Sequence, residues 1–119
     1  MISKRILIAE DEPSQREILV TLAKRKGYDV TVVTDGVDLL KASSNESFDL
    51  IVTDLNMPDL NGASAAEIMK MQGHSIPVIA LTALSPKELQ LVQNTFTKIF
   101  YKPCNYNELF GYIESLLKQ

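Results

Sequence analysis

The sequence predicts an α/β fold in which five strands alternate with five helices, in the order (βα)5, around a doubly wound parallel sheet. Five short apolar runs rich in β-branched residues recur along the chain, and apolar residues at helical spacing lie between them. Such alternation implies right-handed crossovers between parallel strands. The 119 residues, 45% hydrophobic and 23% charged, suffice for one packed domain, which we place at residues 1–119.

The expected strands are RILIA (5–9), YDVTVV (28–33), DLIVT (49–53), PVIALT (77–82) and KIFY (98–101). The runs at 5–9, 49–53 and 77–82 are almost continuously apolar, as in parallel strands that helices cover on both faces. The run at 28–33 alternates more between apolar and polar residues, which predicts a strand at the edge of the sheet.

The first and last helices are predicted from apolar residues at helical spacing. These residues are Ile18, Leu19 and Leu22 in the first helix and Leu109, Ile113, Leu116 and Leu117 in the last. Gly27 should end the first helix, and Gly36 and Gly62 stand near the starts of the second and third.

Capping signals predict where the fourth and fifth helices begin. Ser85-Pro86-Lys87-Glu88 combines an N-cap serine, a proline at the first helical position and a glutamate placed for a capping box. Asn105 and Glu108 repeat this pattern before the last helix. We therefore expect a helix on each side of the strand at 98–101.

Composition narrows the classes of function. The formal net charge of −3 provides no basic surface for a nucleic-acid backbone, so we expect no direct nucleic-acid binding. The lone Cys104 excludes an intramolecular disulfide, and the N-terminus meets charged residues too early for a signal peptide. Because the apolar runs are far shorter than the roughly 20 residues of a spanning helix, we expect a cytoplasmic protein without membrane contact.

Polar residues follow four of the expected strands. They are Glu10-Asp11-Glu12, Asp54-Leu55-Asn56, Thr82 and Lys102-Pro103. Ligands of open α/β sheets bind beyond the carboxyl ends of the strands, so we expect a functional site there. If the first and third strands are neighbours, Glu10, Asp11 and Asp54 converge. Two carboxylates about 5 Å apart repel by roughly 3 kcal/mol at an effective dielectric constant near 20, so this cluster calls for a cation.

Oxygen ligands from carboxylates and a backbone carbonyl suit a hard cation, and a shallow site shared with a phosphoryl group favours Mg²⁺ over Ca²⁺. With its neighbours neutralised, Asp54 can attack phosphorus, as carboxylates do in enzymes that form aspartyl phosphates. Lys102 provides a mobile positive charge for phosphoryl oxygens, and Thr82 provides a hydroxyl donor. The three side chains are candidate catalytic groups.

The segments AED (9–11), DLNMPDLNG (54–62), LTA (81–83) and KP (102–103) together resemble the response-regulator receiver, or CheY-like, domain. The resemblance covers essentially the whole chain and implies a flavodoxin-like sheet of strand order 2-1-3-4-5. It also implies that Asp54 is the phosphoacceptor and that the Lys102–Pro103 bond is cis. The implied Mg²⁺ ligands are Asp11, Asp54, the carbonyl of Asn56 and, through water, Glu10.

The resemblance implies a signalling switch that takes its phosphoryl group from a phosphohistidine of a sensor histidine kinase or histidine phosphotransfer protein. Beyond its own phosphorylation and dephosphorylation, we expect no enzymatic activity. The switch should change the surface of the fourth helix, fifth strand and fifth helix, and so its binding to a downstream protein target or to a second copy of the chain. The switch residues would be Thr82, Ala83, Ile99, Lys102 and Pro103.

Two features depart from the family pattern. The family usually has Phe or Tyr three residues before the lysine, where this chain has Ile99, and Phe100 and Tyr101 are out of register. The usual Gly-Ala pair before the fifth strand is also missing, which predicts a short or irregular fourth helix. We therefore expect the output surface to change by backbone rearrangement rather than by a ring flip.

Other interpretations of the sequence remain open. The alternative function is a receiver-like module that binds proteins without phosphorylation. An aspartate-nucleophile phosphatase would need a carboxylate where Asn56 stands, and the nucleotide-binding glycine motifs are missing. Met57-Pro58 should shape the loop after Asp54, His74 should be a surface residue, and Cys104 a packed residue near the site. The sequence fits a free-standing regulator as well as a receiver within a hybrid kinase or a larger regulator.

Overall fold

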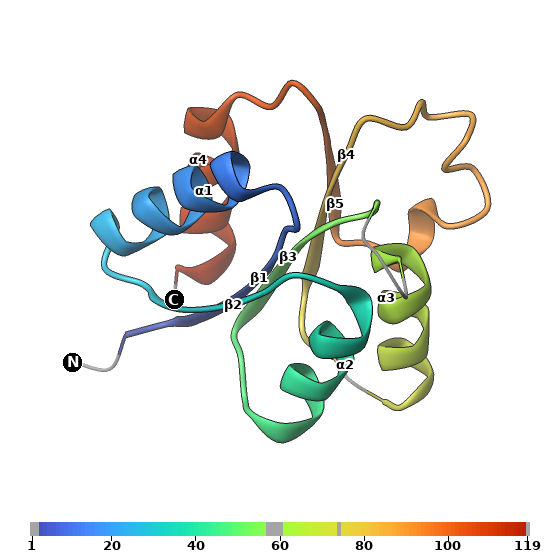
Figure 1. Ribbon diagram of the computed structural model, residues 1–119, viewed down its shortest axis with the longest axis horizontal. Coiled ribbons are helices and arrows are strands. Elements are labelled where there is room, and N and C mark those ends of the chain that lie inside the picture. Colours follow the sequence, from blue (N-terminus) through green and yellow to red (C-terminus); the bar gives the residue numbers. More distant parts are fainter. Residues whose placement is uncertain (1–2, 57–60, 74, 119) are drawn as a thin grey trace.

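The computed structural model describes residues 3–56, 61–73 and 75–118. In these residues, five parallel strands form one sheet in the order β2-β1-β3-β4-β5 (Figure 1). The strands are β1 (Arg5–Ala9), β2 (Asp29–Val33), β3 (Leu50–Asp54), β4 (Val78–Thr82) and β5 (Lys98–Tyr101). Every strand lies within one residue of its predicted run. The parallel sheet and its strand order are confirmed.

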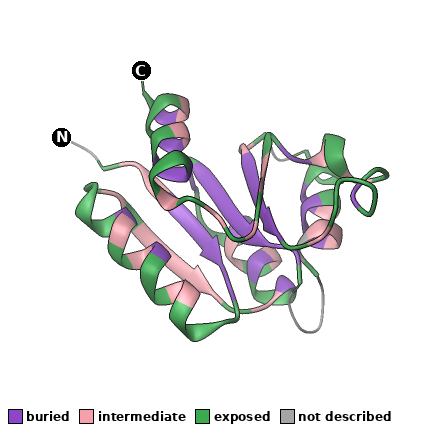
Figure 2. Cartoon of the chain, turned by 90° about the horizontal axis from the view of Figure 1, so that it is seen from above, coloured by how far each residue is buried: buried purple, intermediate pink, exposed green. Residues whose placement is uncertain are grey.

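The three central strands carry the buried part of the sheet. All residues of β3 and β4, and four of the five in β1, are buried, whereas β2 and β5 at the edges are half-buried or exposed (Figure 2). The edge position predicted for the second strand is therefore confirmed. The paired residues Ala9 and Thr53, Asp54 and Leu81, and Thr82 and Tyr101 bring the carboxyl ends of these strands to one edge.

The described residues include four α-helices, two on each face of the sheet. They are α1 (Pro13–Arg25), α2 (Gly36–Asn45), α3 (Gly62–Met71) and α4 (Tyr106–Leu117). Figure 1 shows α1 and α4 on one face and α2 and α3 on the other. None of the helices in the described ranges has both the length and the apolar character needed to span a bilayer.

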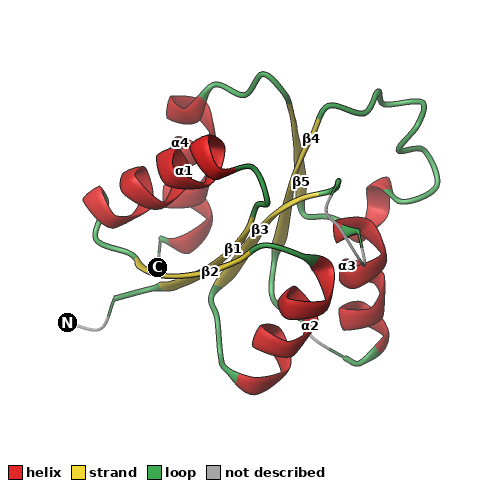
Figure 3. Cartoon of the chain, in the orientation of Figure 1, coloured by secondary structure: helices red, strands yellow, loops and turns green. Residues whose placement is uncertain are grey.

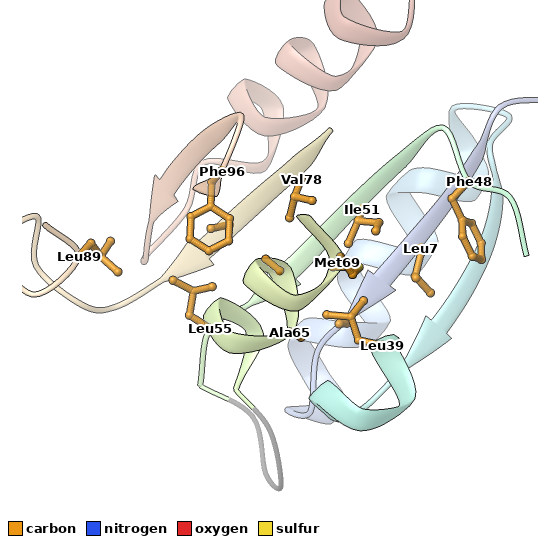
Figure 4. Packing of buried hydrophobic residues seen from close by; sticks show 13 residues of the cluster. Leu7, Leu39, Phe48, Ile51, Leu55, Ala65, Met69, Val78, Leu89 and Phe96 are labelled. Carbon is orange, nitrogen blue, oxygen red and sulfur yellow. The ribbon is translucent and has the colours of Figure 1, made fainter. Parts of the chain in front are cut away.

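Two hydrophobic clusters pack the helices onto the sheet, because successive strand residues point to opposite faces. The α2/α3 cluster (Figure 4) consists of Leu7, Ala9, Leu39, Phe48, Ile51, Leu55, Ala65, Ala66, Met69, Val78, Ala80, Leu89 and Phe96. The α1/α4 cluster consists of Ile6, Ile8, Leu19, Ala23, Leu50, Val52, Ile79, Leu81, Leu109, Phe110, Ile113 and Leu117. The helices therefore hold the sheet from both faces.

Helix boundaries follow local capping chemistry. The side chains of Asp35 and Asn61 accept hydrogen bonds from the first turns of α2 and α3. Asn105 Oδ1 accepts from the backbone of Asn107 and Glu108 at the start of α4, at 2.9 and 3.1 Å. Gly27, at φ +89°, follows α1 in the left-handed conformation that glycine adopts without strain. The predicted ends of these helices are confirmed.

The predicted α-helix between β4 and β5 does not form, but the segment is irregular, as the missing Gly-Ala pair predicted. Within residues 83–97, all of which are described, the chain forms turns and one 3₁₀ helix, η1 (Gln93–Thr95), rather than an α-helix (Figure 3). The capping box itself exists: the Ser85 amide donates to Glu88 Oε1 at 3.0 Å, and the Glu88 amide donates to Ser85 Oγ at 3.2 Å. The order of elements is therefore (βα)5 with its fourth helix replaced by an irregular segment.

The composition of this segment disfavours a helix beyond its cap. Leu89 and Phe96 are buried in the α2/α3 cluster and Val92 packs against it, whereas Leu91 is 98% exposed. The β-branched and polar residues Val92, Asn94 and Thr95 add low helix propensity. Because helix stability in proteins comes mainly from packing an apolar face, a capping box alone is insufficient.

Candidate functional site

The predicted functional residues meet at the carboxyl edge of the sheet. Glu10 directly follows β1, Asp54 ends β3, Thr82 ends β4 and Lys102 directly follows β5. The register places Ala9 beside Thr53, so the residues that follow them, Glu10 and Asp54, continue side by side. The strands rather than the loops therefore fix most of this site.

Three carboxylates form an acidic cluster: Glu10, Asp11 and Asp54 each offer an oxygen atom within 4.8 Å of the others. Glu10 is fully buried and Asp54 is 7% exposed, whereas Asp11 faces solvent. Backbone amides hold the two buried carboxylates: Glu12 donates to Glu10 Oε2 at 3.2 Å, and Asn56 donates to Asp54 Oδ1 at 3.3 Å. The convergence predicted from the sequence is confirmed in the geometry.

Lys102 reaches this cluster from the end of β5. Its Nζ atom lies 3.3 Å from Glu10 Oε1 and 3.3 Å from Asp54 Oδ2. Burial works against the charged ammonium, but the negative charges of Asp54 and Glu10 outweigh it and raise the pKa of Lys102. The lysine is therefore a firmly protonated cation shared by two carboxylates.

The single positive charge of Lys102 does not neutralise the negative charge of the whole acidic cluster. Burial raises the pKa of Glu10, and the charge of Asp54 raises it further, against the lowering effects of the Glu12 amide and of Lys102. Removal of Glu10 from water thus makes its charged form costly even with the lysine in place. A second cation at the open side, beside Asp11, would relieve this cost.

Thr82 is fully buried at the end of β4, on the strand next to Asp54. Its Oγ1 accepts a hydrogen bond from the Leu84 amide at 2.9 Å, and its carbonyl accepts one from the Lys102 amide at 2.7 Å. The hydroxyl is therefore engaged with the chain that leads into residues 83–97. A change in what the hydroxyl binds would act directly on that segment.

The remaining predicted switch residues are Ala83, Ile99 and Pro103. Ile99 is half-buried and packs against the α2/α3 cluster, and Ala83 is exposed after β4. Phe100 points to the other face, where its ring packs edge-on against Tyr112 with centroids 5.9 Å apart. The Lys102–Pro103 peptide bond is cis, as the family resemblance implied. An aliphatic side chain thus occupies the position where the family usually has an aromatic ring.

Sequence reasoning missed the roles of two residues around the start of α1. Glu12 caps α1, since its carboxylate accepts from the Ser14 hydroxyl at 2.6 Å and the Gln15 amide at 2.8 Å, and these bonds lower its pKa. The Arg16 guanidinium donates to the carbonyls of Glu10 and Asp11. Glutamate is not a preferred N-cap residue, and no motif marks Arg16, so neither role carried a signal in the sequence.

Cys104 packs half-buried against the α1/α4 cluster, as predicted. Burial raises the pKa of its thiol, and the charge of Glu108 adds to this effect. A raised pKa reduces the thiolate fraction and hence the reactivity of the cysteine. The predictions made for Met57-Pro58 and His74 lie outside the described residues.

The donor set fits a hard divalent cation. The cluster offers carboxylate oxygens, the Asn56 carbonyl lies two residues beyond Asp54, and histidine and cysteine contribute nothing to the described ligand group. Oxygen ligands around a partly exposed position suit Mg²⁺, which usually retains several water molecules. The residues at this edge can therefore hold Mg²⁺ beside a carboxylate and an ammonium.

The chain is similar to receiver regions of much longer signalling proteins. It is 41% identical over 78 residues to the sensor protein EvgS of Escherichia coli, covering 66% of this chain and 6% of EvgS. It is 33% identical over 119 residues to the transcriptional activator protein PfeR of Pseudomonas aeruginosa, covering 98% of this chain and 39% of PfeR. The chain therefore spans less than half the length of each of these two relatives.

Solved structures support the same relationship over nearly the full chain. The receiver domain of the Francisella response regulator 1452 superposes with a TM-score of 0.90 at 29% identity, covering 96% of both chains. The response regulator TrrA of Thermotoga maritima, solved in complex with Mg²⁺ and BeF, superposes with a TM-score of 0.88 at 30% identity, covering 96% of this chain and 99% of TrrA. The model of the response regulator receiver domain matches residues 6–114. The chain therefore belongs to the response regulator receiver domain family of two-component signalling.

Proposed function

We propose that this chain is a switch controlled by phosphorylation of Asp54, with Mg²⁺ as its cofactor. The observation that carries the proposal is the meeting of Asp54 with Glu10 and Asp11 within 4.8 Å and with Lys102 at 3.3 Å. A carboxylate nucleophile, a cation site and a fixed positive charge are the parts that phosphoryl transfer to aspartate needs.

Asp11, Asp54 and the carbonyl of Asn56 would hold Mg²⁺, with Glu10 acting through water. When bound, the ion neutralises the carboxylates and draws charge from the phosphoryl oxygens. The donor set and the burial of the ligands support this assignment, because Asp11 is exposed whereas Glu10 is buried and paired with Lys102. The ion would therefore approach the site from the solvent beside Asp11.

In the proposed reaction, a carboxylate oxygen of Asp54 attacks the phosphorus atom of a phosphohistidine on a sensor kinase or phosphotransfer protein. The new O–P bond forms as the N–P bond breaks, and the departing imidazole nitrogen takes up a proton from solvent. Lys102 is protonated and lies 3.3 Å from Asp54 Oδ2. Its ammonium would pair with the phosphoryl oxygens and stabilise their negative charge. The chain would turn over only its own phosphoryl group rather than act as an enzyme on other substrates.

The signal would leave the site through Thr82. A phosphoryl group adds about −1.5 to −2 charges and three acceptor oxygens, to which Thr82 can donate its hydroxyl hydrogen while its Oγ1 accepts from the Leu84 amide. Hydrogen bonds to charged groups contribute about 1.5 to 3 kcal/mol each, so two of them approach the roughly 5.5 kcal/mol that moves a two-state equilibrium from 1:99 to 99:1. The energies are sufficient for a switch.

We further propose that residues 83–97 change by backbone rearrangement. The segment is irregular, with only Leu89 and Phe96 fully anchored among its apolar residues, and Ile99 provides no ring to flip. Crystal structures with and without BeF as phosphoryl mimic decide this point. Unchanged coordinates for residues 83–101 would contradict the proposed mechanism.

The output would be altered binding of a downstream protein or of a second copy of the chain, in the cytoplasm. The formal net charge of −3 again favours protein rather than nucleic acid as the target. Binding of candidate proteins should therefore be compared between phosphorylated wild type and Asp54→Ala.

The chemical test is incubation with acetyl phosphate and Mg²⁺ followed by mass spectrometry. We expect a mass gain of one phosphoryl group in the wild type and none in Asp54→Ala. Asp38→Ala, which removes an exposed aspartate from α2, is the matched control and should be phosphorylated normally. No gain in the wild type would favour the phosphorylation-independent binding module, and steady hydrolysis of phosphate esters would favour a phosphatase.

A further inference from the structure

Arg16 connects the start of α1 to the loop that carries the acidic cluster. Its Nη1 atom lies 3.3 Å from the carbonyl oxygen of Glu10 and 3.3 Å from that of Asp11. Side chains of a helix lean toward its N-terminus, so an arginine in the first turns of α1 can reach back to the preceding loop. The guanidinium of the half-buried Arg16 thus bridges two successive peptide groups.

These two peptide groups need such support. Glu10 and Asp11 lie between the end of β1 at Ala9 and the start of α1 at Pro13, outside both elements. The Glu10 amide is fixed by the Val33 carbonyl at 3.1 Å, but the Asp11 carboxylate extends from an exposed position. The placement of the Asp11 carboxylate therefore depends on the loop backbone that Arg16 holds.

We propose that Arg16 is a positioning residue for Mg²⁺: it fixes the backbone of Glu10 and Asp11 so that their carboxylates face Asp54 before the ion binds. The inference rests on the function proposed above. Mg²⁺ demands near-octahedral geometry with ligands at about 2.0–2.1 Å, so a loosely held ligand weakens its binding. Loss of an outer partner that orients metal ligands typically costs about 10- to 100-fold in affinity.

The charge of Arg16 alone predicts a change in Mg²⁺ affinity of the opposite direction. Arg16 carries a positive charge beside a cation site, so its removal should strengthen Mg²⁺ binding if only the charge mattered. Positioning predicts weaker binding. The direction of the change therefore separates the two roles.

The test is calorimetric titration of the full chain with Mg²⁺ alone. We expect Arg16→Ala to bind Mg²⁺ about tenfold more weakly than the wild type. Arg16→Lys, whose ammonium can still donate to the carbonyls, should recover most of the affinity. Arg25→Ala, which removes an exposed charge from the last turn of the same helix, should bind like the wild type.

Phosphorylation by acetyl phosphate supplies a second readout. At saturating Mg²⁺ the Arg16→Ala rate should approach that of the wild type, because the nucleophile and Lys102 are untouched. Should Arg16→Ala fail to fold, Arg16→Gln, whose side chain is too short to bridge both carbonyls, carries the same expectation. Unchanged or tighter Mg²⁺ binding by the folded variant overturns the role of Arg16 alone, whereas a wild type that binds no Mg²⁺ overturns the proposed cofactor and this inference together.

Discussion

Lys102 Nζ lies 3.3 Å from Asp54 Oδ2, and the same atom lies 3.3 Å from Glu10 Oε1. The ammonium therefore holds together two carboxylates, one directly after β1 and the other at the end of β3. Breaking a buried ion pair by removing one partner leaves an uncompensated charge, which costs more than the pair contributed. The lysine thus supports the metal-free fold as well as any chemistry at Asp54.

Replacement of Lys102 by methionine should destabilise the metal-free protein. The change keeps the apolar stem and removes the charge, leaving Glu10 and Asp54 in mutual repulsion. Because the lysine side chain is still 19% exposed, we expect a loss of about 1 to 3 kcal/mol in the free energy of unfolding. Urea unfolding in EDTA measures it.

Added Mg²⁺ should restore part of this loss, since the ion supplies the missing positive charge. Lys87→Met, at an exposed position of the 83–97 segment, is the control and should change stability by less than about 0.5 kcal/mol. Equal unfolding midpoints for Lys102→Met and the wild type in EDTA would show that the lysine does not hold the carboxylates together.

Because the pKa of Glu10 is raised, the stability of the metal-free protein should depend on pH. A carboxyl group with a folded-state pKa above its ordinary value of 4.5 binds protons more tightly in the native state. Its contribution to stability is therefore fully present below that value and is lost as pH rises through the folded-state pKa. The metal-free Glu10→Gln variant should not show this loss. At pH 8 its free energy of unfolding should exceed that of the wild type by on the order of 1 kcal/mol.

The measurement is urea unfolding of both proteins in EDTA from pH 4 to 8. Only the difference in free energy of unfolding between the two proteins isolates the contribution of Glu10. Other groups, such as Glu12, whose pKa is lowered, change stability with pH in the opposite direction. A difference that stays constant across this range would contradict the burial of an ionisable Glu10 in the native state.

Binding of Mg²⁺ to the acidic cluster should raise thermal stability. A ligand that binds only the native state stabilises it by about 2.7 kcal/mol at one hundred times its dissociation constant. Melting temperatures of the wild type should thus rise with Mg²⁺ and fall with EDTA. Asp11→Asn should lose most of this response, because Asp11 is the exposed carboxylate of the cluster. A full response in that variant would place the ion elsewhere.

The sequence predicted the strands and the acidic cluster because both depend on short-range patterns. Continuous apolar runs mark buried parallel strands, and the residues after them must meet at one edge, as Glu10 and Asp54 do. The contact of Lys102 with Glu10 was not predicted, since it depends on how a lysine stem crosses the sheet edge. The Arg16 bridge was missed for a similar reason.

The failure at residues 83–97 has a different cause. Ser85 and Glu88 form the predicted capping box, but a cap specifies only where a helix starts. Whether the helix continues depends on the residues that follow the cap, and Val92, Asn94 and Thr95 have low helix propensity. The capping signal was correct, and the missing Gly-Ala pair correctly indicated an irregular segment.

Leu89 should therefore hold the 83–97 segment onto the domain, and Leu91 should not. Leu89 is 1% exposed and belongs to the α2/α3 cluster, whereas Leu91 is 98% exposed. Leu89→Ala should lower the free energy of unfolding by about 2 kcal/mol or more, and Leu91→Ala by less than about 0.5 kcal/mol. Chemical denaturation of both variants tests this matched pair. Similar losses would mean that the segment packs differently in solution.

Thr82 should control the response of the 83–97 segment without controlling phosphorylation itself. Its Oγ1 accepts from the Leu84 amide at 2.9 Å, and its hydroxyl hydrogen can donate to a phosphoryl oxygen, so a movement of Thr82 toward that oxygen would be transmitted to Leu84. In Thr82→Ala, BeF should still bind at Asp54, because the carboxylates and Lys102 remain. Hydrogen exchange of residues 83–97 should then be the same with and without BeF, whereas the wild type should show a difference.

Thr82→Ser is the matched control for this experiment. Serine keeps the hydroxyl and removes only a methyl group, so it should retain the change in exchange on BeF addition. Thr82→Ala should also speed exchange of the Leu84 amide before BeF is added, because that amide loses its acceptor. If the alanine variant responds to BeF as the wild type does, the signal leaves Asp54 by another route, and Lys102, whose amide donates to the Thr82 carbonyl at 2.7 Å, becomes the residue to test.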